Sequence, residues 1–224
     1  MTNLILVKQR FKNKDLIDQA LTHRSWVNEH KGIRASNERL EFLGDAILEY
    51  IVSKELYAQF PDKEEGYLTA LRANLVNTVS LSEVAKTLEL GEYLFLSKGE
   101  EESGGRTNPS LLADTVEAII GAIFIDRGVE DAEEFVRVNL LVDIKKRAAS
   151  PLKDFKSRLQ ELVQSQSLPA PKYQVVSEAG PDHSKTFVLD VVVGGNAWGR
   201  GEGKSKAVAE QEAAKDAFES HVVK

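Results

Sequence analysis

The sequence Asn37-Glu-Arg-Leu-Glu-Phe-Leu-Gly-Asp-Ala-Ile-Leu48 predicts a helix with two unlike faces. Successive residues of a helix turn by about 100°, which places most of the apolar residues on one side and the acids on the other. The apolar side consists of Leu40, Leu43, Ile47, Tyr50 and Ile51. The acidic side consists of Glu38, Glu41 and Asp45. We therefore expect the helix to bury the apolar side and to present three carboxylates on the other.

Phe42 departs from this pattern, because it projects among the acids at about 40° from Glu38. Three acids alone are typical of an ordinary solvated helix face, and that interpretation stays open. A phenyl ring on the acidic face has no core of its own. We expect Phe42 to enter the pocket of a partner molecule.

A second helix is predicted from Ser110 to Ile125, with Pro109 in its first turn and Gly128 after its end. Its buried stripe consists of Leu112, Val116, Ile119 and Ile123. Asp114 and Glu117 share the opposite face, because residues three apart are neighbours on a helix.

Small residues on both helices predict that the two backbones approach closely. Ala118 and Gly121 lie beside the acids of the second helix, and Gly44 lies in the first. Close packing would gather four carboxylates, those of Glu41, Asp45, Asp114 and Glu117. Like charges need a counter-ion, because repulsion and desolvation would otherwise force some of them to protonate. With no cysteine and no nearby histidine pair, the ligands are hard oxygen atoms, which suit Mg²⁺ or Mn²⁺ rather than Zn²⁺. Such a site typically handles phosphate.

Two motifs resemble those of a known family. The stretch 37–48 resembles the signature of ribonuclease III, and Leu111-Leu-Ala-Asp-Thr-Val-Glu-Ala-Ile-Ile-Gly-Ala-Ile-Phe-Ile-Asp126 resembles the second acidic motif of that family. The resemblance implies an all-α catalytic domain with the ribonuclease III endonuclease fold, expected over residues 1–148. In it, Glu41, Asp114 and Glu117 would bind the metal, while Asp45 and Glu117 would be catalytic.

Three further residues of this part have two interpretations each. Glu38 either favours the helix dipole in the first turn, with Ser36 or Asn37 as the cap, or touches the metal site. Glu65 opens a helix predicted from Asp62 to Val76 and either plays the same dipole role or neighbours the site or the RNA. His23 ends a helix predicted from Asp15 to Trp26, and we expect it to be a structural hydrogen-bonding residue rather than a catalytic one.

Other helices are predicted at 81–88 and 131–146, with a polar loop at 97–108 that could form a mobile edge of the site. Residues 149–151 are expected to be a linker. The pattern then changes to a helix at 152–166, strands at 173–177, 185–193 and 197–199, and a last helix at 205–218. This order predicts a small α+β module, α-β-β-β-α, over residues 152–221.

The second module resembles a double-stranded-RNA-binding domain. The resemblance rests on Phe155-Lys-Ser-Arg-Leu-Gln-Glu-Leu-Val-Gln164, Gly180-Pro-Asp-His183, Phe187 and the stretch 201–211. It implies that Gln160 and Gln164 meet one minor groove and that the His183 loop meets the next. Without the resemblance, both glutamines are ordinary solvated helix residues and His183 is a turn residue.

Basic residues begin the last helix of this module. Lys204 and Lys206 would face the phosphates across the narrow A-form major groove. The family usually carries more lysine or arginine here, whereas this chain has Ala207 and Val208. From residue 151 onward ten basic residues balance ten acidic ones, so the net charge of −6 belongs to the first domain. We expect weak binding by the module, with a shallow dependence on salt.

Composition narrows the remaining possibilities. The chain has 224 residues, 42% of them hydrophobic, which is enough for real cores. There is no membrane-spanning run and no cysteine. We expect a soluble, cytoplasmic protein without disulfides.

The resemblance implies a Mg²⁺-dependent endonuclease, with Mn²⁺ able to substitute, that cuts double-stranded RNA. Its products would carry 5′-phosphate and 3′-hydroxyl ends with short 3′ overhangs, as in the processing of rRNA, mRNA and other structured precursors. One acidic cluster cuts one strand, so a C2 homodimer with Phe42 in its interface is expected to supply the second cluster. A catalytically idle double-stranded-RNA binder is the alternative. A phosphohydrolase of small molecules ranks last, because it leaves the second module without a role.

Overall fold

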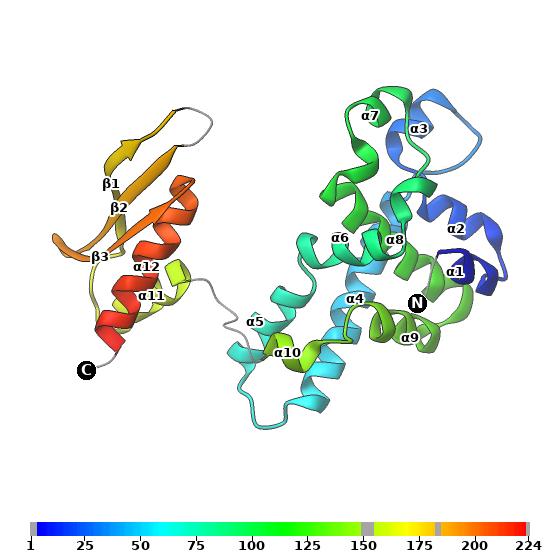
Figure 1. Cartoon of the computed structure of the whole chain (residues 1–224). Helices are drawn as coiled ribbons and strands as arrows, with labels where there is room; N and C mark the ends of the chain where they lie inside the picture. The colour runs from blue at the N-terminus through cyan, green and yellow to red at the C-terminus, as the bar shows by residue number, and fades with distance from the viewer. Residues whose placement is uncertain (1–3, 149–154, 182–184, 223–224) are drawn as a thin grey trace. The chain divides into compact units, whose positions relative to one another are not determined.

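The computed structural model describes residues 4–148, 155–181 and 185–222, and the chain folds into two compact units, 1–150 and 151–224 (Figure 1). The first unit is helical, and the second has the order α-β-β-β-α, as predicted. The expected linker 149–151 lies outside the described residues. Among the described residues, no helix combines the length and apolar character that crossing a membrane requires.

Ten α-helices and two short 3₁₀ helices make up the described part of the first unit. In chain order they are α1 Leu4–Arg10, α2 Lys14–Ala20, α3 Arg24–Glu29, α4 Glu38–Gln59, α5 Glu65–Leu75, α6 Thr78–Thr87, η1 Leu90–Tyr93, α7 Lys98–Glu102, η2 Gly105–Thr107, α8 Pro109–Arg127, α9 Val129–Asn139 and α10 Ile144–Ala148.

Helix α8 is the centre of this unit, with α2, α4, α6 and α9 packed around it (Figure 1). Its ends follow from local chemistry. Asn108 accepts a hydrogen bond from the Ser110 backbone N–H, Pro109 occupies the first turn, and Gly128 ends the helix at φ 93°. Every apolar residue of its predicted stripe is buried, and so are both neighbouring small residues, Ala118 and Gly121.

The crossing of α4 and α8 is as close as the small residues predicted. A methyl group added to Gly44 would overlap the backbone carbonyl of Glu117, and one added to Gly121 would overlap the carbonyl of Leu40. Because backbone atoms cannot rotate away, glycine is required at both places. The contact fixes α4 against α8 next to Glu117.

The buried face of α4 is turned relative to the predicted one. Its buried residues are Leu40, Gly44, Leu48, Ile51, Val52 and Leu56. Leu43 and Ile47 are only half-buried, and Tyr50 is 53% exposed, so the assignment of Tyr50 to the core was wrong. The reason is the close approach at Gly44, which centres the contact with α8 on the line through Gly44 and Leu48.

Two long predicted helices are each divided in the structure. The region expected to form one helix from Asp15 to Trp26 contains α2 and α3, because His23 takes an extended conformation and accepts a hydrogen bond from the Ser25 N–H. The region expected at 131–146 contains α9 and α10, because the adjacent residues Leu140 and Leu141 are both buried and the chain turns there. Helix α1 was not predicted, and α7 lies within the expected polar loop.

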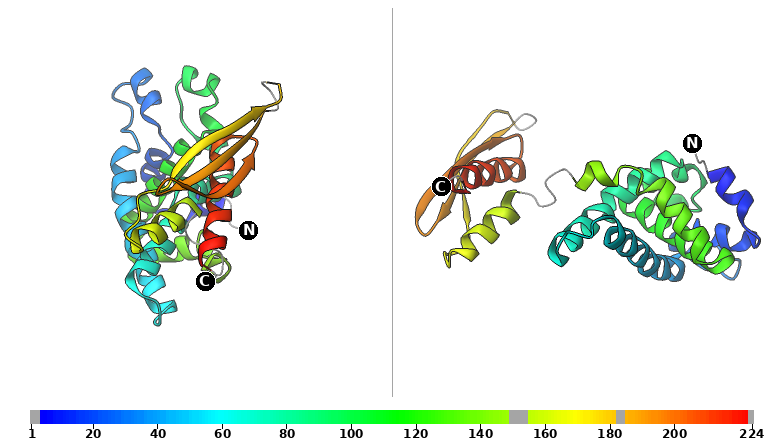
Figure 2. Two further views of the ribbon diagram at one scale, coloured as in Figure 1. Left: turned by 90° about the vertical axis from the view of Figure 1, so that its left-hand side faces the viewer. Right: turned by 90° about the horizontal axis from the view of Figure 1, so that it is seen from below.

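The second unit packs two helices on one sheet (Figure 2). Its elements are α11 Phe155–Ser165, β1 Lys172–Ala179, β2 Thr186–Val193, β3 Asn196–Gly203 and α12 Lys206–Val222. The antiparallel strand order is β1-β2-β3. Alternate residues of β2 face the helices, and the core consists of Leu159, Val163, Val191, Val193, Ala213, Ala214 and Ala217.

Each unit contains one tryptophan stacked on a histidine. Trp26 lies 4.1 Å from His30 between ring centroids, with an interplanar angle of 9°. Trp198 lies 3.9 Å from His221, with an angle of 4°. Both pairs join residues at the periphery of their unit, where the indole is only partly buried.

Candidate metal centre and nucleic-acid interface

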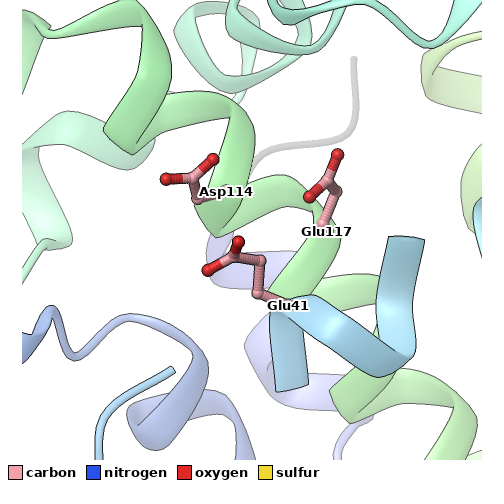
Figure 3. Close-up of side chains that lie close together, drawn as sticks. All are labelled: Glu41, Asp114 and Glu117. Carbon is pink, nitrogen blue, oxygen red and sulfur yellow. The ribbon is translucent and has the colours of Figure 1, made fainter. Parts of the chain in front are cut away.

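Three carboxylates meet where α4 crosses α8 (Figure 3). Glu41 comes from α4, and Asp114 and Glu117 come from α8. One carboxylate oxygen of each residue lies within 4.8 Å of one oxygen of each of the others. All three side chains are half-buried. The structure thus brings together the three residues that were predicted to bind a metal.

The surroundings of Glu41, Asp114 and Glu117, which together are called the trio, raise the pKa of each carboxyl group, with burial as the largest cause. The pKa of Glu117 is raised to about 7, first by burial and then by the charges of Asp45, Asp114 and Glu41. Burial and neighbouring acids also raise the pKa of Glu41. Burial raises the pKa of Asp114, although His23 partly opposes the shift. A divalent cation would offset both the repulsion and the desolvation, so the donor set fits a hard metal ion.

Asp45 lies beside the trio rather than in it. Its side chain is exposed, and its carboxylate does not join the group of three mutually close oxygen atoms found among the described residues. It is nevertheless near enough for its charge to raise the pKa values of both Glu41 and Glu117. The structure therefore brings three of the four expected carboxylates together and places the fourth on their solvent side.

Glu38 and Glu65, the two acids whose role the sequence left open, differ in their surroundings. Glu38 accepts hydrogen bonds from Arg24 at 3.2 Å and from the Ser36 hydroxyl at 2.9 Å, and it lines a cavity next to the trio. Glu65 is the first residue of α5, where it accepts a hydrogen bond from the Thr69 hydroxyl at 2.8 Å. It lines a different cavity, between α4 and α5.

Asn37 and His23 line the cavity next to the trio, and sequence reasoning gave neither a role there. Asn37 precedes α4 but makes no side-chain cap, contrary to the expectation that it or Ser36 would do so. Ser36 donates its hydroxyl to Glu38 instead. No sequence signal indicates where these side chains point, because their orientation depends on contacts with distant segments.

The second unit exposes four of the five residues expected to contact RNA. Gln160 and Gln164 lie one turn apart on α11, both exposed. Lys204 lies between β3 and α12, and Lys206 is the first residue of α12; both are exposed. The expected His183 contact lies outside the described residues.

The beginning of α12 carries little additional positive charge. Ala207 and Val208 are exposed at the positions where the family usually carries further basic residues. One turn later, Glu210 forms an ion pair with Lys156 of α11 at 2.7 Å. At the beginning of α12, the positive charge available for phosphates is therefore that of Lys204 and Lys206.

Aromatic side chains are exposed along α4. Phe42 is 81% exposed and Tyr57 is 78% exposed, with Tyr50 between them. Tyr50 and Tyr57 line the cavity between α4 and α5, which has a volume of about 650 Å³. Three large aromatic side chains are thus exposed on one helix, and two of them line a recess.

A helical unit with a carboxylate centre that suits a metal ion, joined to an α-β-β-β-α module, defines the class: a nuclease domain followed by an RNA-binding domain. Comparisons agree with this for each unit. A family model described as Ribonuclease-III-like matches residues 13–144, and one described as Double-stranded RNA binding motif matches residues 155–221.

Curated relatives cover both units together. Ribonuclease 3 of Desulforamulus reducens is 48% identical, over 94% of this chain and 86% of the relative. Ribonuclease 3 of Geobacillus kaustophilus is 47% identical over the same shares. The solved nuclease domain of ribonuclease III from Campylobacter jejuni is 41% identical, with a TM-score of 0.56, over 67% of this chain and 99% of that one. A second structure of that domain is also 41% identical, with a TM-score of 0.55, over 61% of this chain and 97% of that one. It is described as flexible in the region involved in dimer formation.

This chain belongs to the ribonuclease III family. It is an endoribonuclease that cleaves double-stranded RNA. The presence of Glu41, Asp114 and Glu117 in one cluster favours an active enzyme over an idle RNA binder.

Proposed function

We propose that this enzyme uses Mg²⁺, with Mn²⁺ able to substitute, held by Glu41, Asp114 and Glu117. The observation that carries the proposal is the group of three half-buried carboxylate oxygens within 4.8 Å of one another. Carboxylates in the absence of thiolate and imidazole ligands select hard divalent ions. When bound, the ion would offset the charge of the scissile phosphate and favour deprotonation of the attacking water.

Glu117 and Asp45 have further roles in this proposal. The pKa of Glu117 is the most strongly raised in the site. The ionised form of Glu117 therefore depends most on stabilisation by a bound cation. We assign to Asp45, whose exposed side chain is near enough to act on the charges of Glu41 and Glu117, the role of holding the attacking water and accepting its proton. In-line attack on the phosphorus would leave a 5′-phosphate on one product and a 3′-hydroxyl on the other.

The cleavage experiment uses a long perfect RNA duplex with Mg²⁺, and records binding in parallel. Wild type is expected to yield short duplexes, whereas Glu117→Gln binds but cuts at least about 10³-fold more slowly, because a metal-bound charge is lost. Glu83→Gln, which alters an exposed acid paired with Lys86 on α6, is the matched control and should cut normally. A wild type that binds but never cuts with Mg²⁺ or Mn²⁺ would establish the idle-binder alternative.

We also propose a C2 homodimer, since a cut through both strands needs two acidic clusters. Phe42 and the cavity lined by Tyr50, Tyr57 and Glu65 lie along the same helix, so one surface offers both a protruding ring and a recess. A two-fold axis would place the ring of each protomer in the recess of the other. Two cuts at this fixed spacing would give short 3′ overhangs.

The dimer is tested with Phe42→Asp in analytical ultracentrifugation. Because Phe42 is 81% exposed in the isolated chain, the substitution should leave the monomer folded while dissociating the dimer. Ile33→Asp, at another residue that is 68% exposed, is the matched control and should remain dimeric. A Phe42→Asp protein that stays dimeric would remove Phe42 from the interface.

The cellular substrates that fit this activity are rRNA, mRNA and other structured RNA precursors that form duplexes. An enzyme that acts on such precursors would work in the cytoplasm. Recognition by A-form shape and 2′-hydroxyl groups would allow one enzyme to process several sequences.

A further inference from the structure

A cavity of about 230 Å³ adjoins the metal-binding acids on the side of α3. Glu41 and Asp114 line it together with His23 and Asn37, and Leu94, Leu96 and Leu111 supply apolar lining. Two members of the trio therefore face both the metal site and this cavity. A group bound here would be a direct neighbour of the reacting phosphate.

Asn37 is a buried polar residue whose side chain has no hydrogen-bond partner among the described residues. Asn13, Asn77 and Asn108 each precede a helix and accept a hydrogen bond from its first turn. Asn37 also precedes a helix, yet its backbone is helical at φ −75° and ψ −13° and its amide makes no such bond. Only 4% of the residue is exposed. Because Asn37 lines the cavity, its amide is held inside the protein and is available to a ligand bound there.

His23 supplies a second donor to the same cavity. Its Nδ1 accepts a hydrogen bond from the Ser25 N–H at 3.3 Å and lies 2.8 Å from the Ser25 Oγ. That oxygen accepts from the Ser97 N–H at 3.0 Å, so its own proton is available for Nδ1. With Nδ1 as an acceptor, the ring proton is on Nε2. Within residues 4–148, Nε2 has no hydrogen-bond partner.

Backbone hydrogen bonds hold both side chains at the cavity. The N–H of Asn37 donates to the Thr22 carbonyl at 2.8 Å, and the N–H of His23 donates to the Phe95 carbonyl at 3.1 Å. The backbones of the two residues are thus joined through the same short segment, Thr22-His23. Such preorganised donors are suited to hold a substrate oxygen beside a reacting centre.

We propose that Asn37 and His23 bind a backbone oxygen of the RNA strand, either a 2′-hydroxyl or a phosphate oxygen of a nucleotide next to the scissile phosphate. The inference rests on the metal-dependent cleavage proposed above. The contact positions the strand so that the scissile phosphate lies over Glu41, Asp114 and Glu117. Both residues contact substrate in this role, and neither binds the metal.

The first experiment compares Asn37→Ala with Asn77→Ala in single-turnover cleavage and in thermal unfolding. Asn37→Ala is expected to lower the cleavage rate by roughly tenfold or more, since a hydrogen bond to a charged or reacting group is lost, with little change in Tm. Asn77→Ala removes a helix cap with a bond of 2.9 Å to Ser80, so it should lower Tm and leave cleavage unchanged. His23→Asn, which can still cap α3, should lower cleavage as Asn37→Ala does.

The second experiment identifies the oxygen with duplexes that carry one 2′-deoxy or one methylphosphonate substitution near the cleavage site. If the contact is real, one modification slows wild type but adds no further loss to Asn37→Ala, and its type assigns the hydroxyl or the phosphate. The inference is overturned if wild type cuts with Mg²⁺ and both variants cut equally well, or if every modification slows wild type and variant by the same factor. A wild type that does not cut would instead overturn the proposed function.

Discussion

The acidic centre of the first unit and the RNA-binding surface of the second are built in opposite ways. At the centre, three side chains are half-buried and held by a helix crossing in which backbone meets backbone at Gly44 and Gly121. On the binding surface, the expected contacts are exposed side chains at the surface of α11 and at the start of α12.

This difference determines where each function is sensitive to change. Chemistry at the centre needs charges at fixed separations, so a small displacement has a large effect. Binding to an A-form duplex sums several weak contacts to phosphates and grooves, so no one residue dominates. Four substitutions, two in each unit, test that contrast.

Gly121→Ala is expected to destabilise the first unit by about 3 kcal/mol and to abolish cleavage, because the methyl group would overlap the Leu40 carbonyl. Calorimetry of the full chain should show the first unit melting at a lower temperature while the second unit melts as before. Gly66→Ala is the control, since a methyl group there meets nothing within 4 Å and alanine favours the helix. Equal melting of Gly121→Ala and wild type would contradict the close crossing.

Glu117→Gln is expected to stabilise the metal-free protein at pH 8 by about 1 kcal/mol, a value reduced for the solvent screening of a half-buried group. The folded pKa of about 7 exceeds the reference value of 4.5. The stability that protonation contributes is therefore complete below pH 4.5 and is lost as the pH rises through 7.

Urea unfolding in the presence of a chelator, at about pH 5 and about pH 8, measures this dependence. Wild type should be less stable at the higher pH, and Glu117→Gln should lose most of the difference. Added Mg²⁺ should stabilise wild type more than the variant at the higher pH. A metal-free wild type that is most stable at the higher pH would show that repulsion among the acids is not the dominant effect.

Val208→Lys is expected to strengthen duplex binding by about threefold at moderate salt and to steepen the salt slope by about 1, because a third lysine would join Lys204 and Lys206. Binding is measured by fluorescence anisotropy over a salt series. Val176→Lys, on exposed β1, adds the same charge elsewhere and should change neither quantity as much. Identical slopes for the two variants would mean that only net charge matters.

Gln160→Ala should have the smallest effect, a loss of roughly two- to threefold in affinity, as expected for one exposed hydrogen bond. The comparison is Gln174→Ala on β1, also exposed but on a strand that is not expected to face RNA. If Gln160→Ala weakened binding by about a hundredfold, the binding surface would depend on single residues as the acidic centre does.

Much of the first unit could be predicted because its two main helices carry strong local signals. Pro109 and Gly128 mark the limits of α8, and the spacing of Asp114 and Glu117 places both on one face. The buried face of α4 was predicted less well, because hydrophobicity alone predicts that Tyr50 is buried in preference to Gly44. Gly44 is buried because the backbone of α8 packs against it, and the hydrophobic periodicity of the sequence does not indicate such a contact.

The trio could be predicted from the sequence, whereas the cavity beside it could not. Acids at helical spacing reveal a shared face wherever the helix lies. The position of Asn37 depends instead on its bond to Thr22, and that of His23 on its bond to Phe95, which is distant in sequence. Helix α1 was also missed, although Leu4 and Val7 within it are buried.

The two stacked indoles give this chain one optical probe for each unit. Its two tryptophans, Trp26 and Trp198, each lie against an imidazole of the same unit, so unfolding of that unit separates the two rings and should change the indole emission. Replacing either tryptophan with phenylalanine therefore leaves a single emitter. The fluorescence of the intact enzyme can then follow the nuclease unit or the RNA-binding unit separately, without an attached dye.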